Sequence, residues 1–238
     1  MKLAVISDVH GNLHALDAVL EDVARQGVAQ TVALGDFVSG PFDPRGVADR
    51  FIELGLVSVR GNHDRFITDG RRDDWVIDAL ARSLLDVRQT AWLAAVPATA
   101  TLGAEVLLCH GTPRDDNTLW LDGVGEDGKV FHRSRESIEA EASGFDYPVL
   151  LCGHSHIPRT LRLADGRLVV NPGSVGLPMA MGSTDARYAI VERLGDDWSV
   201  SLRAIPYDHE AAARQARSHG YENWAIAVAT GWPLPRDL

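Results

Sequence analysis

The sequence contains no apolar run that approaches the length of a transmembrane helix. Its amino-terminal apolar stretch, residues 3–6, spans four residues, which is too short for the core of a signal peptide. Only two cysteines occur, Cys109 and Cys152, and two lone cysteines do not make a disulfide framework. We therefore expect a cytoplasmic protein that makes no membrane contact.

Basic residues are also few. The chain of 238 residues carries 23 lysines and arginines against 33 acidic residues, a net charge of -10, and only Lys2 and Lys129 are lysines. The arginines are spread along the chain, whereas a protein that binds phosphate backbones shows a basic stripe. General nucleic-acid binding is therefore disfavoured. The 45% hydrophobic residues indicate a globular protein with an ample core.

The hydrophobic pattern alternates strands with helices in the first half of the chain and gives mostly strands in the second. Apolar runs predict strands at residues 3–7, 31–34, 56–60, 105–109, 149–152, 167–170, 186–193 and 198–206. Helical spacing predicts helices at residues 12–27, 45–54, 73–95, around 138–142 and at 208–219. We expect an α/β (α+β) fold of two packed sheets with helices outside, in one domain over residues 1–238. A homo-oligomer stays open, with the hairpin 186–206 as a candidate pairing surface.

Short polar motifs stand where the apolar runs end. They are Asp8-Val9-His10, Gly35-Asp36, Gly61-Asn62-His63-Asp64, Cys109-His110-Gly111 and Gly153-His154-Ser155-His156. Open α/β sheets place ligand sites at the carboxyl ends of strands, so the motifs are expected to converge. Carboxylate oxygens mixed with imidazole nitrogens suit divalent transition ions. The pattern therefore indicates a dinuclear metallohydrolase.

A hydrolase with two metal ions needs a carboxylate that bridges both ions and a bound water whose pKa falls toward ~7. Asp36 is the natural bridge, because its carboxylate has two oxygens and Gly35 lets the backbone approach closely. Asp8 and His10 lie two residues apart and can turn toward one ion. The simpler alternative is that Asp8 and Asp36 are helix caps or turn residues.

The later motifs supply further ligands. His154 and His156 repeat the spacing of two, which allows one imidazole for each ion or both on the same ion. Asn62 offers an amide oxygen, although it can equally be a left-handed turn residue after Gly61. His110 offers another ring nitrogen, and its alternative is a satisfied core histidine.

These motifs, in this order, resemble the calcineurin-like metallophosphoesterases over roughly residues 1–176, and the turn 171–176 resembles their small prokaryotic phosphodiesterase branch. The resemblance implies a two-sheet β-sandwich flanked by helices in four layers, to which the C-terminal hairpin and helix, residues 186–230, also belong. By matching positions, it implies that one ion is held by Asp8, His10, Asp36 and His156. The other would be held by Asp36, Asn62, His110 and His154. Manganese is the first expectation for the two divalent ions, with iron, nickel, cobalt, zinc or magnesium as alternatives.

The resemblance also implies the reaction. A hydroxide that bridges the two ions would attack phosphorus in line, and His63 would be the general acid beside the leaving oxygen. Imidazole titrates near neutrality, which suits it to this proton transfer. The protein serine/threonine phosphatases follow Gly-Asp with an aspartate and an arginine, but residues 37–41 here carry neither charge. A phosphoprotein substrate is therefore disfavoured, and the orientation of His63 is left to Asp64, Asp43 or the backbone.

We accordingly expect a phosphodiesterase acting on a small nucleotide-like phosphoester. The alternatives are a phosphomonoesterase, a dinucleoside-polyphosphate hydrolase, or a catalytically silent metal-binding scaffold. Asn12 is a candidate for contact with the substrate phosphate, or it caps the following helix. Arg114 lies in a loop, residues 111–130, that is expected to roof the site, and it contacts phosphate or makes a structural ion pair. Cys109 and Cys152 are interpreted as buried small hydrophobes rather than zinc ligands.

Overall fold

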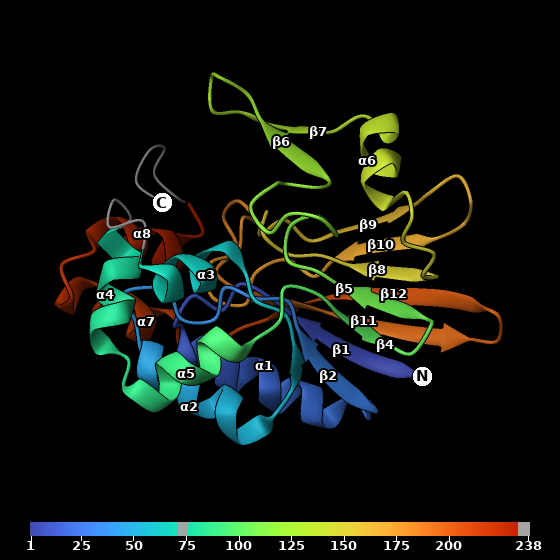
Figure 1. The fold of residues 1–238 in the computed structure, drawn as a ribbon. Helices are drawn as coiled ribbons and strands as arrows, with labels where there is room; N and C mark the ends of the chain where they lie inside the picture. The colour runs from blue at the N-terminus through green and yellow to red at the C-terminus, as the bar shows by residue number, and fades with distance from the viewer. Residues whose placement is uncertain (71–75, 233–238) are drawn as a thin grey trace.

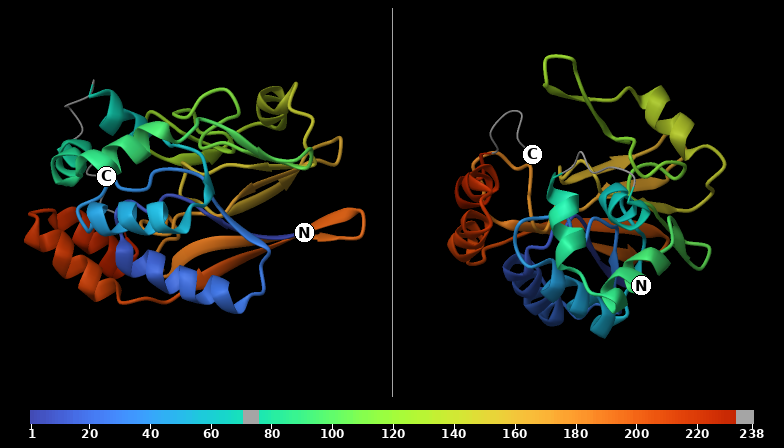
Figure 2. Two further views of the ribbon diagram at one scale, coloured as in Figure 1. Left: turned by 60° about the horizontal axis from the view of Figure 1, so that its bottom comes forward. Right: turned by 60° about the vertical axis from the view of Figure 1, so that its left-hand side comes forward.

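The computed structural model describes residues 1–70 and 76–232, in which two five-stranded sheets pack face to face (Figures 1 and 2). The strand order of the first sheet is β12-β11-β1-β2-β3. These strands are β1 (Lys2–Ile6), β2 (Gln30–Ala33), β3 (Val57–Ser58), β11 (Ala186–Leu194) and β12 (Asp197–Ile205). Strands β1, β2 and β3 run parallel, and β11 pairs antiparallel with both β1 and β12.

The second sheet has the order β4-β5-β8-β10-β9. Its strands are β4 (Ala100–Leu102), β5 (Val106–Leu108), β8 (Val149–Leu151), β9 (Arg159–Arg162) and β10 (Leu168–Asn171). The central strands β5, β8 and β10 are parallel. A separate hairpin of β6 (Asp122–Val124) and β7 (Val130–His132) stands out from the body at the top of Figure 1.

The core lies between the sheets and under the helices, because side chains alternate across each strand. In β1, Leu3 and Val5 pack against Val106 and Leu108 of the other sheet. Ala4 and Ile6, the residues between and after them, pack against the helices instead. The two buried faces of β1 explain why its sequence is a continuous apolar run.

Helices cover both outer faces (Figure 2). The helices are α1 (Leu13–Arg25), α2 (Pro44–Leu54), α3 (Asn62–Asp69), α4 (Val76–Leu84), α5 (Val87–Ala95), α6 (Arg135–Ala142), α7 (His209–Ser218) and α8 (Glu222–Thr230). Helices α1, α2 and α5 pack on the first sheet, and α6 packs on the second. Local sequence sets where they begin: Asp43 caps α2, whose first residue is Pro44, and Asp86 forms a capping box with Gln89 at α5.

The four-layer architecture is confirmed. The segment predicted as helical over residues 73–95 forms two helices, α4 and α5, and its residues 73–75 lie outside the described residues. One local expectation was wrong, because the predicted loop 111–130 contains strand β6 and the first residue of β7. The motif at residues 61–64 begins helix α3, and a further helix, α8, follows residue 219. Helix α8 forms because residues 222–230 are rich in alanine and contain no proline. Within the described residues, no helix has the length and apolar character needed to cross a bilayer.

Candidate metal centre

The polar motifs meet at one edge of the two sheets. Asp8 follows β1, Asp36 follows β2, and His110 follows β5. The side chains of all three are almost completely buried, with exposed fractions of 1% or less. Because the carboxyl ends of parallel strands lie together, residues from distant parts of the sequence become neighbours here.

Six of the predicted ligands form two groups, and within each group the ligand atoms lie within 4.8 Å of one another. The first group is Asp8, His10 and His156, and the second is Asp36, His110 and His154. Asp36 lies between the groups, since its Oδ2 is 3.1 Å from His110 Nε2 and 4.0 Å from His10 Nε2. The amide oxygen of Asn62 joins the second group, 3.1 Å from His110 Nε2. The structure therefore brings together every residue that the sequence nominated as a ligand.

Backbone carbonyls orient all four imidazoles. The contacts are His10 Nδ1 to Ser39 O (2.7 Å), His110 Nδ1 to Leu34 O (2.6 Å), His156 Nδ1 to Leu177 O (2.8 Å) and His154 Nε2 to Asn117 O (3.1 Å). A carbonyl oxygen only accepts, so the ring nitrogen that faces it carries the hydrogen. The opposite nitrogen of each ring is then free to bind a metal ion, which is the usual arrangement around metal-binding histidines.

The atoms directed into the cluster are acceptors that face one another. His10 Nε2 and His156 Nε2 are 3.0 Å apart, and Asp8 Oδ1 lies 3.4 Å from His156 Nε2. That carboxylate oxygen is buried and has no hydrogen-bond partner among the described residues. Converging lone pairs of this kind are stabilised by a cation, and a mixture of carboxylate, amide and imidazole donors fits divalent transition ions.

The backbone is strained at these positions. In residues 1–70 and 76–232, the non-glycine residues with positive φ are Asp8 (54°), His10 (49°), Asp36 (54°), His154 (68°) and His156 (59°). Side chains of L-amino acids make this conformation unfavourable, at a cost of about 1–2 kcal/mol per residue. All five are predicted ligands, so the surrounding fold holds them in strained geometry at the metal centre. The sequence gives no signal of this strain.

The protonation states suit metal binding. Burial lowers the pKa of His10 and that of His154 to about 4, which keeps both rings neutral at pH 7. Burial opposes the charged form of His110 as well, but the adjacent Asp36 carboxylate raises the pKa of His110 to about 10. A cation at this position would do what that proton does, since both offset the charge of Asp36.

Asp78 is a partner of His63 that the sequence analysis missed. His63 Nδ1 lies 3.0 and 3.1 Å from the two carboxylate oxygens of Asp78, which is fully buried on α4. Ser39 Oγ donates a hydrogen bond of 2.5 Å to the same carboxylate. Asp78 belongs to none of the motifs and is separated from His63 by fifteen positions, so only the packing of α4 against α3 reveals the contact.

The two aspartates that we considered for orienting His63 are engaged elsewhere. The carboxylate of Asp64 accepts hydrogen bonds from the backbone N–H groups of Gly61, Asp36 and Phe37. Asp43 accepts from the backbone of Gly46 as the cap of α2. Asp64 therefore fastens the start of α3 to the loop after β2, which places Asn62 beside Asp36.

Asn12 is committed to structural contacts. Its Oδ1 accepts from Ala15 N at 3.1 Å, and its Nδ2 donates to Gly176 O and Tyr207 Oη, both at 3.1 Å. The side chain is completely buried. The helix-cap alternative is therefore the one that these contacts support, rather than contact with substrate.

Replacing Asn12 by alanine should cost about 1–3 kcal/mol of stability, because it removes the cap of α1 and leaves buried partners unsatisfied. The KM for a phosphoester substrate should change less than about twofold. Urea denaturation and steady-state kinetics on the same preparation test both points. A variant with normal stability and a KM raised tenfold would instead identify Asn12 as a substrate contact.

Arg114 turns away from the cluster. Its guanidinium donates to the carbonyl oxygens of Glu141 and Ser143 at the end of α6, both at 2.5 Å, and lies over the ring of Phe145. These contacts support a structural role for Arg114. The thiols of Cys109 and Cys152 are buried in the core, and burial raises the pKa of each thiol, as expected of small core residues.

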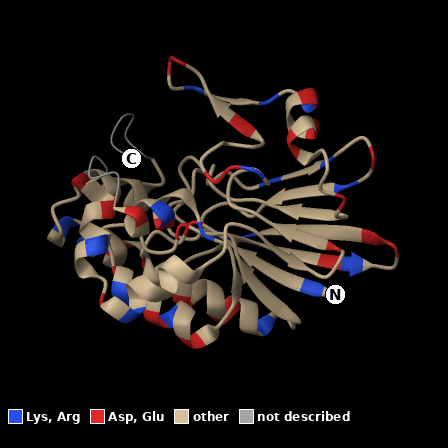
Figure 3. Cartoon of the chain, viewed as in Figure 1, with Lys and Arg blue, Asp and Glu red and all other residues tan. Residues whose placement is uncertain are grey.

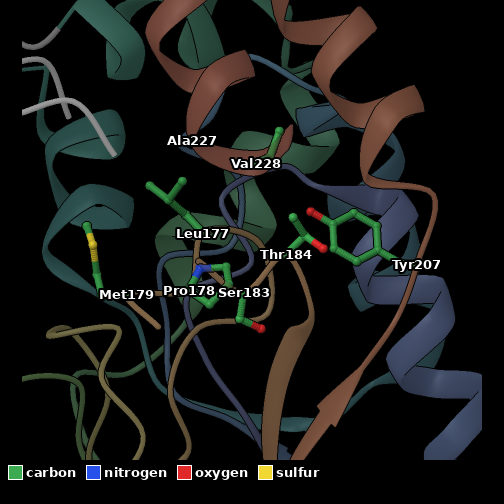
Figure 4. Close-up of a pocket in the computed structure, with 8 residues that line it drawn as sticks. All are labelled: Leu177, Pro178, Met179, Ser183, Thr184, Tyr207, Ala227 and Val228. Atoms are coloured by element: carbon green, nitrogen blue, oxygen red, sulfur yellow. The ribbon is translucent and has the colours of Figure 1, made fainter. Parts of the chain in front are cut away.

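A narrow crevice lies behind His156. Figure 4 shows Leu177, Met179, Tyr207 and Val228 around it, between α8 and the segment after β10. The crevice is too narrow to hold a water molecule. It is therefore a packing gap behind the Leu177 carbonyl that orients His156, and not a place for substrate.

Charged residues of both signs alternate over the outer helices and hairpins, and Figure 3 shows no stripe of one sign along the described chain. The carboxylates of the metal centre are instead interior to the fold.

Comparisons with known proteins agree with this geometry. The family model of the calcineurin-like phosphoesterase superfamily domain matches residues 1–194. The chain is 27% identical over 248 residues to uncharacterized protein MJ0912 of Methanocaldococcus jannaschii, a match covering 93% of this chain and 94% of that protein. A crystal structure of a metallophosphoesterase from Sphaerobacter thermophilus has a TM-score of 0.80 and 27% identity, covering 98% of this chain and 100% of that one. A shorter match, 40% identical over 74 residues, covers 27% of this chain and 40% of the phosphodiesterase YfcE of Escherichia coli K12.

Proposed function

Since the chain belongs to the calcineurin-like phosphoesterase superfamily, we propose that it hydrolyses small phosphodiesters with two divalent metal ions and with His63 as general acid. The observation that carries the proposal is the cluster of seven predicted ligands with His63 beside it. His63 follows Asn62 directly, and its backbone N–H donates to Asp36 Oδ1 at 3.0 Å. The same short segment thus contributes to metal binding and to proton transfer.

The metal ions, when bound, supply positive charge for the phosphoryl oxygens and lower the pKa of a bound water. Asp8, His10, Asp36 and His156 would hold one ion, and Asp36, Asn62, His110 and His154 the other. Manganese is our first choice for both, because the carboxylate and amide oxygens of the cluster suit Mn²⁺, while its imidazoles also suit iron, nickel and zinc.

His63 would deliver the proton to the leaving oxygen. Burial disfavours its charged form, but the carboxylates of Asp36 and Asp78 raise the pKa of His63 to about 9. The ring is therefore protonated at pH 7. Asp78 accepts the hydrogen on Nδ1, which leaves the hydrogen on Nε2 for the departing alkoxide.

The contacts of Arg65 and Arg114 favour a diester over a monoester, because both guanidinium groups are bound to other parts of the protein. Arg65 is paired with the carboxylate of Asp116, and Arg114 is bound to carbonyl oxygens of α6. A monoester dianion carries one more negative charge than a diester and gains more from an arginine at the phosphate. The match to a protein named phosphodiesterase points the same way.

Turnover of bis-p-nitrophenyl phosphate and of p-nitrophenyl phosphate, with and without Mn²⁺, tests the proposal. We expect the diester to be hydrolysed with the higher kcat/KM, and only with metal. A preference for the monoester would favour a phosphomonoesterase, and hydrolysis of dinucleoside polyphosphates alone would favour that class. Metal binding without turnover of any phosphoester would favour the alternative that the protein is a catalytically silent metal-binding scaffold.

A further inference from the structure

The carbonyl that orients His154 differs from the other three. The imidazoles of His10, His110 and His156 face carbonyls of buried residues, which are Ser39, Leu34 and Leu177. His154 faces the carbonyl of Asn117, an exposed residue in the loop that follows His110. The orientation of His154 therefore depends on where that loop lies.

The roof loop, which we define as residues 111–118, is folded tightly on itself. A side chain at Gly111 would come within 2.6 Å of Asp115 O and 2.7 Å of Thr118 O, so the loop closes directly over its own start. Asp115 Oδ1 accepts hydrogen bonds from Asn117 N at 3.0 Å and from Thr118 Oγ1 at 2.8 Å. One end of the loop is attached to the end of α6, where Arg114 donates to the carbonyls of Glu141 and Ser143.

The part of the loop next to Asn117 is attached to α3 by a bidentate ion pair. Arg65 Nε donates to Asp116 Oδ2 at 2.8 Å, and Arg65 Nη2 donates to Asp116 Oδ1 at 2.6 Å. The guanidinium also lies over the ring of Phe66, 4.8 Å from its centre. The side chains of Arg65 and Asp116 are 29% and 12% exposed, so the pair is partly shielded from solvent. Planar, bidentate pairing fixes the relative position of two segments better than a single contact does.

The pair connects two segments that serve the same ion. Helix α3 begins with Asn62 and carries Arg65 one turn later. The roof loop carries Asp116 and the carbonyl of Asn117, which orients His154. Asn62 and His154 both belong to the group of ligands around Asp36 and His110.

We propose that Arg65 and Asp116 are positioning residues that set the affinity of the ion site formed by Asp36, Asn62, His110 and His154. This inference rests on the proposed function, because it takes the cluster to bind two ions. At the other site, the rings of His10 and His156 are oriented by the carbonyls of two buried residues, Ser39 and Leu177, and not by the roof loop. The site that depends on the roof loop should therefore bind its ion more weakly and exchange it faster.

Titration of the chelator-stripped, full-length protein with Mn²⁺ tests this. Wild type should bind two ions with unequal affinities, and R65A should bind the second about 10- to 100-fold more weakly while the first is unchanged. D116A should have the same effect, because it removes the same pair. R135A, which breaks an exposed pair with Glu139 on α6, is the matched control and should leave both affinities unchanged.

Electron paramagnetic resonance gives a readout independent of turnover. At a Mn²⁺ concentration that fills both sites of wild type, the exchange-coupled spectrum of two neighbouring ions should give way in R65A to that of an isolated ion. Unchanged affinities in R65A and D116A, or equal weakening of both sites, would overturn the inference even if wild type hydrolyses diesters. If wild type binds one ion, this inference fails; if it neither binds Mn²⁺ nor hydrolyses a phosphoester, the proposed function fails with it.

Discussion

Replacing Asp36 by asparagine should lower the turnover of bis-p-nitrophenyl phosphate by about three orders of magnitude or more. Asp36 Oδ2 lies 3.1 Å from His110 Nε2 and 4.0 Å from His10 Nε2, so this one carboxylate serves both groups of ligands. The neutral amide keeps the size of the side chain but loses the charge shared by the two sites. Steady-state kinetics and metal analysis of the same sample measure the effect.

The stabilisation of the protein by metal should disappear in the same variant. A ligand that binds only the folded state at 100 times its Kd stabilises it by about 2.7 kcal/mol. Mn²⁺ should therefore raise the Tm of wild type and leave that of D36N almost unchanged. A variant that keeps its metal, its Tm increase and its turnover would show that Asp36 is an ordinary turn residue.

The position of the site could be predicted from the sequence because polar motifs follow the ends of the predicted strands. Apolar runs such as β5 and β8 end one or two residues before a polar motif, and parallel strands bring their carboxyl ends to one edge. Where each strand stops and which residue follows were enough to place Asp8 beside Asp36, because β1 and β2 are parallel neighbours in one sheet. His110 follows β5 of the other sheet, so its place beside Asp36 depends on how the two sheets pack, and before the structure only the family resemblance implied it.

The residues that the sequence could not reveal depend on such packing. Asp78 reaches His63 only because α4 lies against α3, and its own segment reads as an ordinary amphipathic helix. The structural role of Asn12 depends on Tyr207, which comes from the far end of the chain. Left-handed backbone at Asp8 and His154 is likewise imposed by tertiary contacts, since neither residue type requires it.

Removing the imidazole in H63A should lower kcat by about 10²- to 10³-fold for a diester with an alkyl leaving group, while bound Mn²⁺ stays at the level of wild type. His63 belongs to neither of the two groups of candidate ligands, and its ring faces Asp78. The loss should be smaller for p-nitrophenolate, because this leaving group departs without a proton. A loss of metal together with activity would contradict the role of general acid.

D78N should move the alkaline limb of the kcat profile to lower pH by about one unit or more. The carboxylate of Asp78 helps to raise the pKa of His63 to about 9, and the acid works only while it is protonated. Wild type should therefore lose activity as the pH rises through the pKa of His63, and the variant should lose it earlier. The matched control is D49N, which removes an exposed carboxylate paired with Arg88.

The dependence on the leaving group separates proton donation from support of the fold. If Asp78 acts through His63, the loss of kcat in D78N should grow as the leaving group becomes more basic, and H63A should show the same trend more steeply. The double variant should be no slower than H63A, because the carboxylate has nothing left to orient. If D78N lowers kcat equally for every leaving group, or if the double variant is slower than H63A, Asp78 only holds α4 in place.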